Sequence, residues 1–277
     1  MPYKAGKAPS VSTTTLVEMK QKGHKIAALT AYDAPTAALL EEAGVDVILC
    51  GDSLGMVKLG YESTLPVTVE EILHHTKAVK RGVSRALLVA DLPFLSYEID
   101  LKDAVRNAGR LIKEGGAAAV KLEGGMEMAP VVKELLRVNI PVMGHLGLTP
   151  QAVHKLGGYK VQGRRPQEAE KMLTDAKVLE AAGAFCLVLE CVPPSVAREI
   201  TRKVGIPTIG IGAGPDCDGQ ILVIDDMLGM SEASMKFVKR YAELRPQMAK
   251  AVSAYCKEVR EGAFPAAEHQ FAEAAKA

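Results

Sequence analysis

The chain has 277 residues, of which 48% are hydrophobic, and its 34 Lys and Arg nearly balance its 33 Asp and Glu. This balance excludes the broad basic field with which proteins bind nucleic acid or an acidic membrane, so we expect neither partner. No apolar run approaches the roughly 18 residues of a membrane helix, and the five cysteines form no CxxC pair, which predicts reduced thiols in a cytoplasmic protein.

Short apolar runs alternate with helical segments along the chain. The polar N-terminal residues 1–15 are interpreted as a flexible arm, with a transit peptide as the alternative, and a short entry helix is predicted over 11–23. Strands are predicted at 26–30, 45–50, 86–90, 118–122, 141–144, 185–189, 207–211 and 221–224. Helices are predicted at 34–43, 68–81, 101–114, 127–138, 167–182 and 195–204.

The remaining segments are predicted as loops or as a C-terminal extension. Two long glycine-containing loops are expected at 51–66 and 145–165. Residues 232–262 are predicted to be helical with a break at Pro246, and 264–277 to form a tail. No change of composition marks a domain boundary, so residues 1–277 are expected to form one domain with an entry helix and a C-terminal helical extension.

Eight apolar runs that alternate with helices predict an α/β fold, a (β/α)8 TIM barrel. The strands are apolar almost throughout, which is typical of strands that are buried on both faces. A doubly wound open sheet is the alternative. In both architectures ligands bind at the carboxyl ends of the strands.

Ionisable residues follow the predicted strands at that end. They are Asp52, Asp91, Lys121, Glu123, His145 and Glu190, and we expect them to share one pocket. Two carboxylates in one buried pocket repel each other, so either one is protonated or a cation lies between them. Oxygen ligands from Asp52, Asp91 and Glu123, without a Cys or His cluster, suit Mg²⁺. Such a site could chelate a 2-oxo acid.

The other residues of this set have several possible roles. Lys121 and Glu123 lie two residues apart and therefore point to the same side of their strand. Lys121 could bind a substrate carboxylate or an enolate oxygen, form a Schiff base, or simply pair with Glu123. His145 could contact substrate or carry a proton, and Glu190, in an apolar frame, could act as a general base; structural roles are the alternatives.

A glycine-rich segment near the end of the barrel resembles a dinucleotide-binding loop only superficially. It runs Gly210-Ile211-Gly212-Ala213-Gly214 and is followed by Pro215, where the helix of a dinucleotide fold would begin. The third glycine of that fingerprint is missing at the required spacing. We interpret the segment as a close-packed loop. A nicotinamide-dependent oxidoreductase, in which this loop would bind the dinucleotide, is a rival hypothesis.

Several motifs together resemble the ketopantoate hydroxymethyltransferase family. They are Gly51-Asp52-Ser53-Leu54-Gly55-Met56, Ala90-Asp91-Leu92-Pro93-Phe94, Val120-Lys121-Leu122-Glu123-Gly124-Gly125, Gly144-His145-Leu146-Gly147-Leu148-Thr149-Pro150-Gln151, Leu189-Glu190-Cys191-Val192-Pro193 and Gly210-Ile211-Gly212-Ala213-Gly214 with Asp218-Gly219-Gln220. The resemblance extends from about Thr14 to Phe271, and the chain matches the family at every site position.

The resemblance implies a barrel of the phosphoenolpyruvate mutase and isocitrate lyase group, assembled as a homodecamer. It implies transfer of a hydroxymethyl group from 5,10-methylenetetrahydrofolate to 3-methyl-2-oxobutanoate, giving 2-dehydropantoate, the first committed step of pantothenate synthesis, through a Mg²⁺-stabilised enolate. The roles it implies are Asp52, Asp91 and Glu123 as metal ligands, Asp52, Ser53, Asp91, Lys121 and His145 as substrate-binding residues, and Glu190, Lys121 and His145 as the catalytic set.

Two further hypotheses remain beside the oxidoreductase. One is a Mg²⁺-dependent carbon–carbon lyase or mutase that acts on another 2-oxo acid, which would need no folate. The other is a non-catalytic barrel that binds a small acid.

Overall fold

The computed structural model describes residues 9–231 and 235–271. Part of the expected N-terminal arm, residues 1–8, lies outside these residues, and so does the end of the expected C-terminal tail, residues 272–277. Residues 1–224 form one compact unit and residues 225–277 a second. The prediction that the whole chain is one barrel domain with a C-terminal extension stays a prediction.

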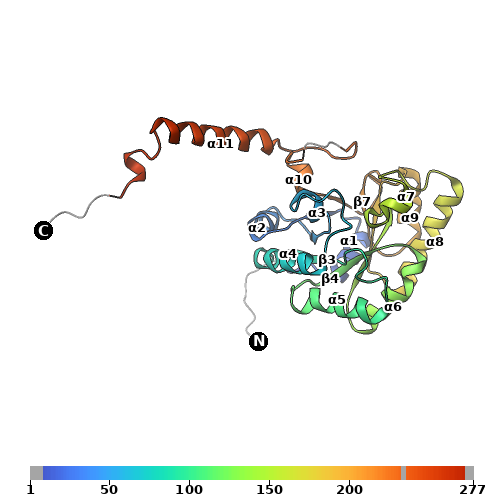
Figure 1. The fold of residues 1–277 in the computed structure, drawn as a ribbon. Helices are drawn as coiled ribbons and strands as arrows, with labels where there is room; N and C mark the ends of the chain where they lie inside the picture. Colours follow the sequence, from blue (N-terminus) through green and yellow to red (C-terminus); the bar gives the residue numbers. More distant parts are fainter. Residues whose placement is uncertain (1–8, 232–234, 272–277) are drawn as a thin grey trace. The chain divides into compact units, whose positions relative to one another are not determined.

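The first unit is a closed barrel of eight parallel strands in sequence order, which confirms the (β/α)8 prediction and rules out the open sheet. Figure 1 shows the helices arranged around the strands. The strands are β1 Ile26–Thr30, β2 Val47–Cys50, β3 Leu87–Asp91, β4 Ala119–Glu123, β5 Val142–Gly147, β6 Cys186–Glu190, β7 Thr208–Ile211 and β8 Gly219–Leu222.

Helices connect most of the strands. They are α1 Thr13–Gln21, α2 Ala34–Glu42, α3 Leu54–Val57, α4 Val69–Gly82, α5 Leu101–Lys113, α6 Ala129–Arg137, α7 Val153–Leu156, α8 Pro166–Ala182, α9 Pro194–Lys203, α10 Ile224–Met227 and α11 Leu244–Glu261, with 3-10 turns η1 Met126–Met128, η2 Pro150–Ala152 and η3 Ala267–His269. No helix is predicted between the last two strands. In agreement, residues 212–218, all of them described, form turns and bends between β7 and β8 and no helix.

Local sequence explains where the helices begin. Thr68 caps α4 through the backbone N–H of Glu71, and the Glu71 carboxylate returns a hydrogen bond to the backbone of Thr68. Asp33 caps α2 and Asp100 caps α5: each carboxylate accepts a hydrogen bond from the backbone N–H three residues later. These caps fix where each helix begins after the loop that follows β1, β2 or β3.

Glycines inside strands account for two wrong strand boundaries. The strand predicted at 141–144 continues to Gly147, so His145 lies on β5 itself. A Cβ at Gly144 would lie 2.8 Å from Leu187 Cδ2, and one at Gly219 would lie 2.5 Å from the carbonyl oxygen of Ile26. These glycines allow close packing within strands, whereas in the sequence they indicate loops.

Both long loops contain short helical turns that the sequence did not predict. The loop 51–66 contains α3, and the loop 145–165 contains η2 and α7. A Cβ at Gly55 in α3 would lie 2.5 Å from Val67 Cγ2, so the first loop folds back tightly on itself. Both loops follow the carboxyl ends of strands and thus surround the predicted site.

The C-terminal unit is less helical than predicted. Residues 235–243 are not helical, whereas residues 232–234 lie outside the described part. The helix α11 begins only at Leu244, so Pro246 falls in its first turn, where a missing N–H leaves no hydrogen bond broken, and it does not interrupt a longer helix. Gly262 ends α11 with a φ of 70°. The expected tail contains η3.

The N-terminal segment contributes to the apolar core of the barrel. Val11 and Leu16 pack with inward-facing strand residues such as Ile26, Leu87 and Cys186 in one cluster. The entry helix predicted from the sequence is therefore part of the barrel core.

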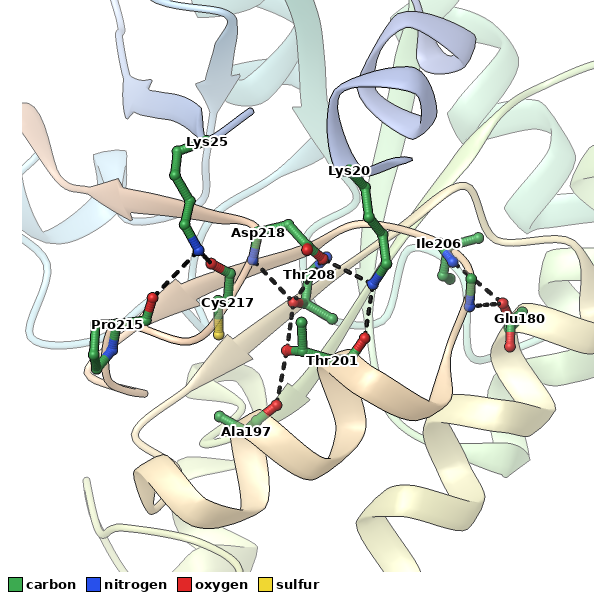
Figure 2. A network of polar contacts seen from close by, with 11 residues as sticks. Lys20, Lys25, Glu180, Ala197, Thr201, Ile206, Thr208, Pro215, Cys217 and Asp218 are labelled. Atoms are coloured by element: carbon green, nitrogen blue, oxygen red, sulfur yellow. Dashed lines mark hydrogen bonds and ion pairs between the residues drawn. The ribbon is translucent and has the colours of Figure 1, made fainter. Parts of the chain in front are cut away.

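A polar network anchors α1 to the last strands of the barrel (Figure 2). Lys20 Nζ lies 2.9 Å from Asp218 Oδ2 and donates to the carbonyl oxygen of Thr201 at 2.8 Å. The same Asp218 oxygen accepts from the backbone N–H of Thr208 at 2.8 Å. Because the side chains of Lys20 and Asp218 are largely buried, removal of one would leave the other without its ion-pair partner in a place with little access to water.

We expect Lys20→Met to lower the free energy of unfolding by about 2 kcal/mol, since a charged hydrogen bond is lost and Asp218 keeps a partly uncompensated charge. Thermal unfolding at matched protein concentration measures this. Lys22→Met is the matched control on the same helix, because Lys22 pairs only with the exposed Glu18, and a change below about 0.5 kcal/mol is expected there. Equal effects of the two substitutions would contradict the structural role of Lys20.

Candidate active site

The alternation of side chains along the strands carries the ionisable residues into the barrel mouth. Leu87 and Val89 of β3 face the barrel core, so the next inward position is Asp91. Cys186 and Val188 on β6 lead in the same way to Glu190. The inward rows of β4 and β5 likewise end in Lys121 with Glu123 and in His145.

Strand register places these residues side by side. Asp91 pairs with Lys121 across β3 and β4, and Glu123 pairs with His145 across β4 and β5. On β6, Glu190 pairs with Gly147, two residues beyond His145. The structure therefore brings together residues that the sequence separates by up to a hundred positions.

The five side chains form a continuous row of alternating charge. Lys121 Nζ lies 2.6 Å from Asp91 Oδ1 and 3.7 Å from Glu123 Oε1. His145 Nδ1 lies 3.4 Å from Glu123 Oε1, and its Nε2 lies 3.3 Å from Glu190 Oε2. All are buried except Glu190, whose side chain is 16% exposed. Glu190 is thus the member of the row that is most open to solvent.

Asp52 joins this row from the turn after β2. Its backbone N–H donates to Asp91 Oδ2 at 3.0 Å, and its side chain is buried. Burial raises the pKa of Asp52 well above its usual value, and the negative charges of Asp91 and Glu123 raise it further. This carboxylate therefore needs a further positive charge to remain ionised.

The two cationic members of the row are strongly held in their charged forms. Burial opposes the charge of Lys121, but Asp91, Glu123 and Asp52 outweigh it and raise the pKa of the ammonium. Burial and Lys121 lower the pKa of His145, yet Glu123 and Glu190 raise it to about 9. A protonated lysine is a poor nucleophile, so the geometry favours an electrostatic role for Lys121 over a Schiff base.

The excess of carboxylates fits a divalent cation. The site holds four carboxylates, those of Asp52, Asp91, Glu123 and Glu190, and in the described part of the chain the cations in ion-pair contact with the row are Lys121 and His145. Their oxygens are the hard ligands that Mg²⁺ prefers. Among the described residues, however, no three His, Cys, Asp or Glu side chains are already arranged around a common metal position. Mg²⁺ commonly uses one or two carboxylates and completes its shell with water and substrate oxygens, which is compatible with this arrangement.

Two buried groups in the row have unused hydrogen-bonding capacity. Neither ring nitrogen of His145 makes a well-formed hydrogen bond with a described residue, because both carboxylate contacts are long. Asp91 Oδ1 is close to Lys121 Nζ, but the pair lacks the orientation of a hydrogen bond. Buried polar groups without partners are rare in folded proteins and indicate places where a ligand can bind.

Ser53 lies beside Asp52 but is not part of the ion-pair row. Its Oγ is 2.9 Å from the hydroxyl of Tyr32, which is buried after β1. Sequence reasoning identified Ser53 and missed Tyr32, although Tyr32 lies two residues beyond the end of β1, just as Asp52 lies two residues beyond the end of β2.

Three more residues at the site were missed. Gln151 and Tyr97 are both buried; Gln151 contacts the carboxylates of Asp52 and Glu123, and the Tyr97 hydroxyl contacts the backbone of Glu123. Tyr159, in the loop after β5, places its hydroxyl 3.8 Å from Met56 Sδ. Partial burial raises the pKa of Tyr159, and so do the negative charges of Asp52, Glu190 and Glu123. Gln151 lies within the motif of residues 144–151, but neither its role nor that of Tyr97 or Tyr159 can be recognised from a sequence pattern.

The glycine-rich segment 210–214 does not form a dinucleotide-binding loop. Gly212 and Gly214 have positive φ values of 65° and 83°, and the chain then turns directly toward β8. The side-chain amide of Gln220 donates to the carbonyl oxygen of Gly214 at 2.9 Å. Without a helix after the glycines there is no helix N-terminus for a pyrophosphate, so the structure disfavours the oxidoreductase hypothesis. None of the helices in the described part of the chain is both long and apolar enough to cross a membrane.

Comparisons with known proteins agree with this geometry. The family model of ketopantoate hydroxymethyltransferase matches residues 10–267. A 3-methyl-2-oxobutanoate hydroxymethyltransferase from Thermoanaerobacter sp. (strain X514) is 59% identical over 262 residues, covering 94% of this chain and 96% of the relative. The protein of the same name from Geotalea daltonii is 56% identical, covering 93% of this chain and 98% of the relative.

Solved structures with low sequence identity share the fold. A phosphonopyruvate hydrolase complex with oxalate and Mg²⁺ has a TM-score of 0.62 at 14% identity, covering 93% of this chain and 92% of the other. A 2,3-dimethylmalate lyase, described as a member of the PEP mutase/isocitrate lyase superfamily, has a TM-score of 0.57 at 15% identity, covering 94% and 91%. These likenesses confirm the predicted barrel fold.

Proposed function

The chain belongs to the ketopantoate hydroxymethyltransferase family, and we propose that it transfers a hydroxymethyl group to 3-methyl-2-oxobutanoate, the reaction for which its relatives are named. The one-carbon donor is 5,10-methylenetetrahydrofolate and the product is 2-dehydropantoate, in the first committed step of pantothenate synthesis. The observation that carries the proposal is the row from Asp91 to Glu190, in which carboxylates, an ammonium and an imidazole meet in one barrel mouth.

The substrate has a carboxylate and a keto group at one end and an acidic C3 hydrogen beside the keto carbon. Mg²⁺, held by Asp52 and Asp91 with Glu123 directly or through water, would polarise the keto group and so acidify C3. Ser53 and His145 would bind substrate oxygens. His145 is suited to this because both of its ring nitrogens lack good hydrogen-bond partners. The backbone N–H of Asp52 donates to the Asp91 carboxylate, and this hydrogen bond holds Asp52 and Asp91 next to each other.

Lys121 and Glu190 have complementary tasks at the reacting carbon. The Lys121 ammonium is fixed by Asp91 and Glu123 and can stabilise negative charge that develops on the keto oxygen when C3 loses its proton. Glu190, the most solvent-accessible acid of the row, would accept that proton. The C3 electron pair then attacks the methylene carbon of the folate, whose bonds to the two folate nitrogens are broken in the course of the reaction. Water supplies the hydroxyl oxygen of the product, and tetrahydrofolate leaves with both nitrogens free of the methylene carbon.

Deuterium exchange at C3 of 3-methyl-2-oxobutanoate, followed by NMR, tests this function. With Mg²⁺ and before any folate is added, we expect exchange well above the rate without protein. Addition of methylenetetrahydrofolate should then give 2-dehydropantoate. If exchange is absent, turnover with folate distinguishes ordered binding from a wrong assignment, and absence of both would refute the proposal.

The rival carbon–carbon lyase or mutase would use the same Mg²⁺ site on another 2-oxo acid. Names of relatives at 55–59% identity favour the transferase, and a product that forms without folate would favour the rival. A non-catalytic barrel that binds a small acid would give neither exchange nor product.

We further propose that the protein is cytoplasmic and forms a homodecamer. All five cysteines are free thiols, as expected in a reducing compartment. Self-association is supported by α11, on which Met248, Val252, Tyr255 and Val259 share one face and are each about half exposed. Light scattering of the intact protein gives the assembly mass, and a monomeric mass would refute self-association.

A further inference from the structure

Gln151 is a buried amide that connects the carboxyl ends of three strands. It lies in η2, in the loop after β5, and only 6% of its surface is exposed. Its side-chain Nε2 donates to Asp52 Oδ2 at 2.8 Å and to the carbonyl oxygen of Leu92 at 3.0 Å. Its backbone N–H donates to Glu123 Oε2 at 3.0 Å. One residue thus contacts two of the three proposed metal ligands.

A tyrosine fixes the orientation of this amide. Tyr97 is buried in the loop after β3, and its hydroxyl lies 2.7 Å from Gln151 Oε1. The same hydroxyl accepts from the backbone N–H of Glu123 at 3.1 Å. If the amide were flipped, its oxygen would face the Leu92 carbonyl oxygen, which has no proton to give, and the Asp52 carboxylate, which has none in the ionised form that binds a metal. The network therefore allows only one orientation of Gln151.

The hydrogen bonds from Gln151 leave each acid free to act through its other oxygen. On Asp52 the amide occupies Oδ2, and on Glu123 the backbone N–H occupies Oε2. Glu123 Oε1 is the oxygen that faces Lys121 and His145. Carboxylates that bind metals are commonly oriented in this way by hydrogen bonds from outside the ligand set.

We infer that Gln151, held by Tyr97, is a positioning residue that fixes the carboxylates of Asp52 and Glu123 for Mg²⁺ binding. This inference rests on the proposed function, because it assigns a role within the same site. It goes beyond the sequence motifs, in which Gln151 and Tyr97 had no role.

Direct calorimetric titration of the protein with Mg²⁺ in the presence of 3-methyl-2-oxobutanoate tests the inference. Gln151→Met keeps the length of the side chain and removes every side-chain hydrogen bond, so we expect the Mg²⁺ dissociation constant to rise about 10- to 100-fold. Tyr97→Phe removes one oxygen and should raise it about 3- to 10-fold by loosening Gln151. In C3 exchange, both variants should recover most of their rate at saturating Mg²⁺.

Gln220→Leu on β8 serves as the matched control. It also removes a side-chain amide that donates to a backbone carbonyl oxygen, in this case that of Gly214 in the loop between β7 and β8. It should bind Mg²⁺ as the unmodified protein does. Should Gln151→Met fold poorly, Tyr97→Phe alone decides the question. Mg²⁺ affinities of both variants within twofold of the unmodified protein would overturn this inference alone. An unmodified protein that neither binds Mg²⁺ nor forms product would overturn the proposed function, and this inference with it.

Discussion

Replacement of Asp91 by Asn is expected to weaken Mg²⁺ binding at least about 100-fold and to lower kcat/KM roughly 1,000-fold. Both oxygens of Asp91 face donors, since Oδ2 accepts from the backbone N–H of Asp52 and Oδ1 lies beside Lys121 Nζ. An asparagine has only one acceptor atom. Its amide nitrogen would therefore face either an N–H group or an ammonium, and one buried donor would lose its partner.

Mg²⁺ titration calorimetry and steady-state kinetics at several Mg²⁺ concentrations measure the two effects of this substitution. Asp100→Asn is the matched control, because Asp100 follows the same strand and only caps α5, a task that Asn performs equally well. Mg²⁺ affinity at the unmodified level in the Asp91→Asn protein would refute the assignment of Asp91 as a metal ligand, even if activity were lost.

The strand-end acids could be predicted from sequence because one physical rule places all of them. A buried parallel strand has an apolar inward row, and the first ionisable residue at its end must lie at the barrel mouth. Asp91, Lys121 and Glu190 follow this rule directly. The ion pairs among them follow from register, which depends on barrel closure and is not visible in any one segment.

Residues that reach the site from loops could not be predicted in this way. Tyr97 lies six residues beyond the end of β3, and Gln151 lies four beyond the end of β5. Loop conformation depends on contacts such as those of Gly55 with Val67, which arise only in the folded chain. Periodicity therefore identifies the acids of the site, whereas the groups that orient them require the three-dimensional structure.

Glycine misled the strand predictions for a related reason. Gly144 and Gly219 suggest loops by their conformational freedom, but in the barrel they allow close approach of Leu187 and of the backbone of Ile26. The helical prediction for 232–262 is confirmed for Leu244–Glu261 and wrong for residues 235–243, which form a turn, a bend and irregular chain. Pro246 lies in the first turn of α11 and does not break a longer helix.

The arrangement of the site acids assigns Mg²⁺ binding and proton transfer to different residues. Asp52, Asp91 and Glu123 are buried and linked through Lys121 or Gln151, so substitutions among them should alter metal affinity first. Glu190 lies at the other end of the row, where it contacts His145, and its side chain is partly exposed. Its substitution should therefore affect proton transfer with little effect on the metal.

We expect Glu190→Gln to lower the rate of C3 deuterium exchange about 1,000-fold, because an amide cannot accept the substrate proton. Binding of Mg²⁺ and of 3-methyl-2-oxobutanoate should change less than about threefold, since Gln keeps the size of the side chain and an oxygen that can face His145 Nε2. NMR exchange and calorimetry on the same samples measure the two quantities. Glu199→Gln on α9 is the matched control, because that side chain is exposed.

Two outcomes of the Glu190 experiment lead to different mechanisms. Loss of exchange with intact binding would place the proton on Glu190, and His145 would then stabilise the ionised carboxylate that receives it. Exchange at the unmodified rate, together with loss of overall turnover, would remove Glu190 from the base role and assign it to a later step, after the new carbon–carbon bond has formed. In that case another group near C3 must accept the proton, and His145 could do so only if it lost its own proton when Mg²⁺ and substrate bound, because the two carboxylates hold it in the charged form.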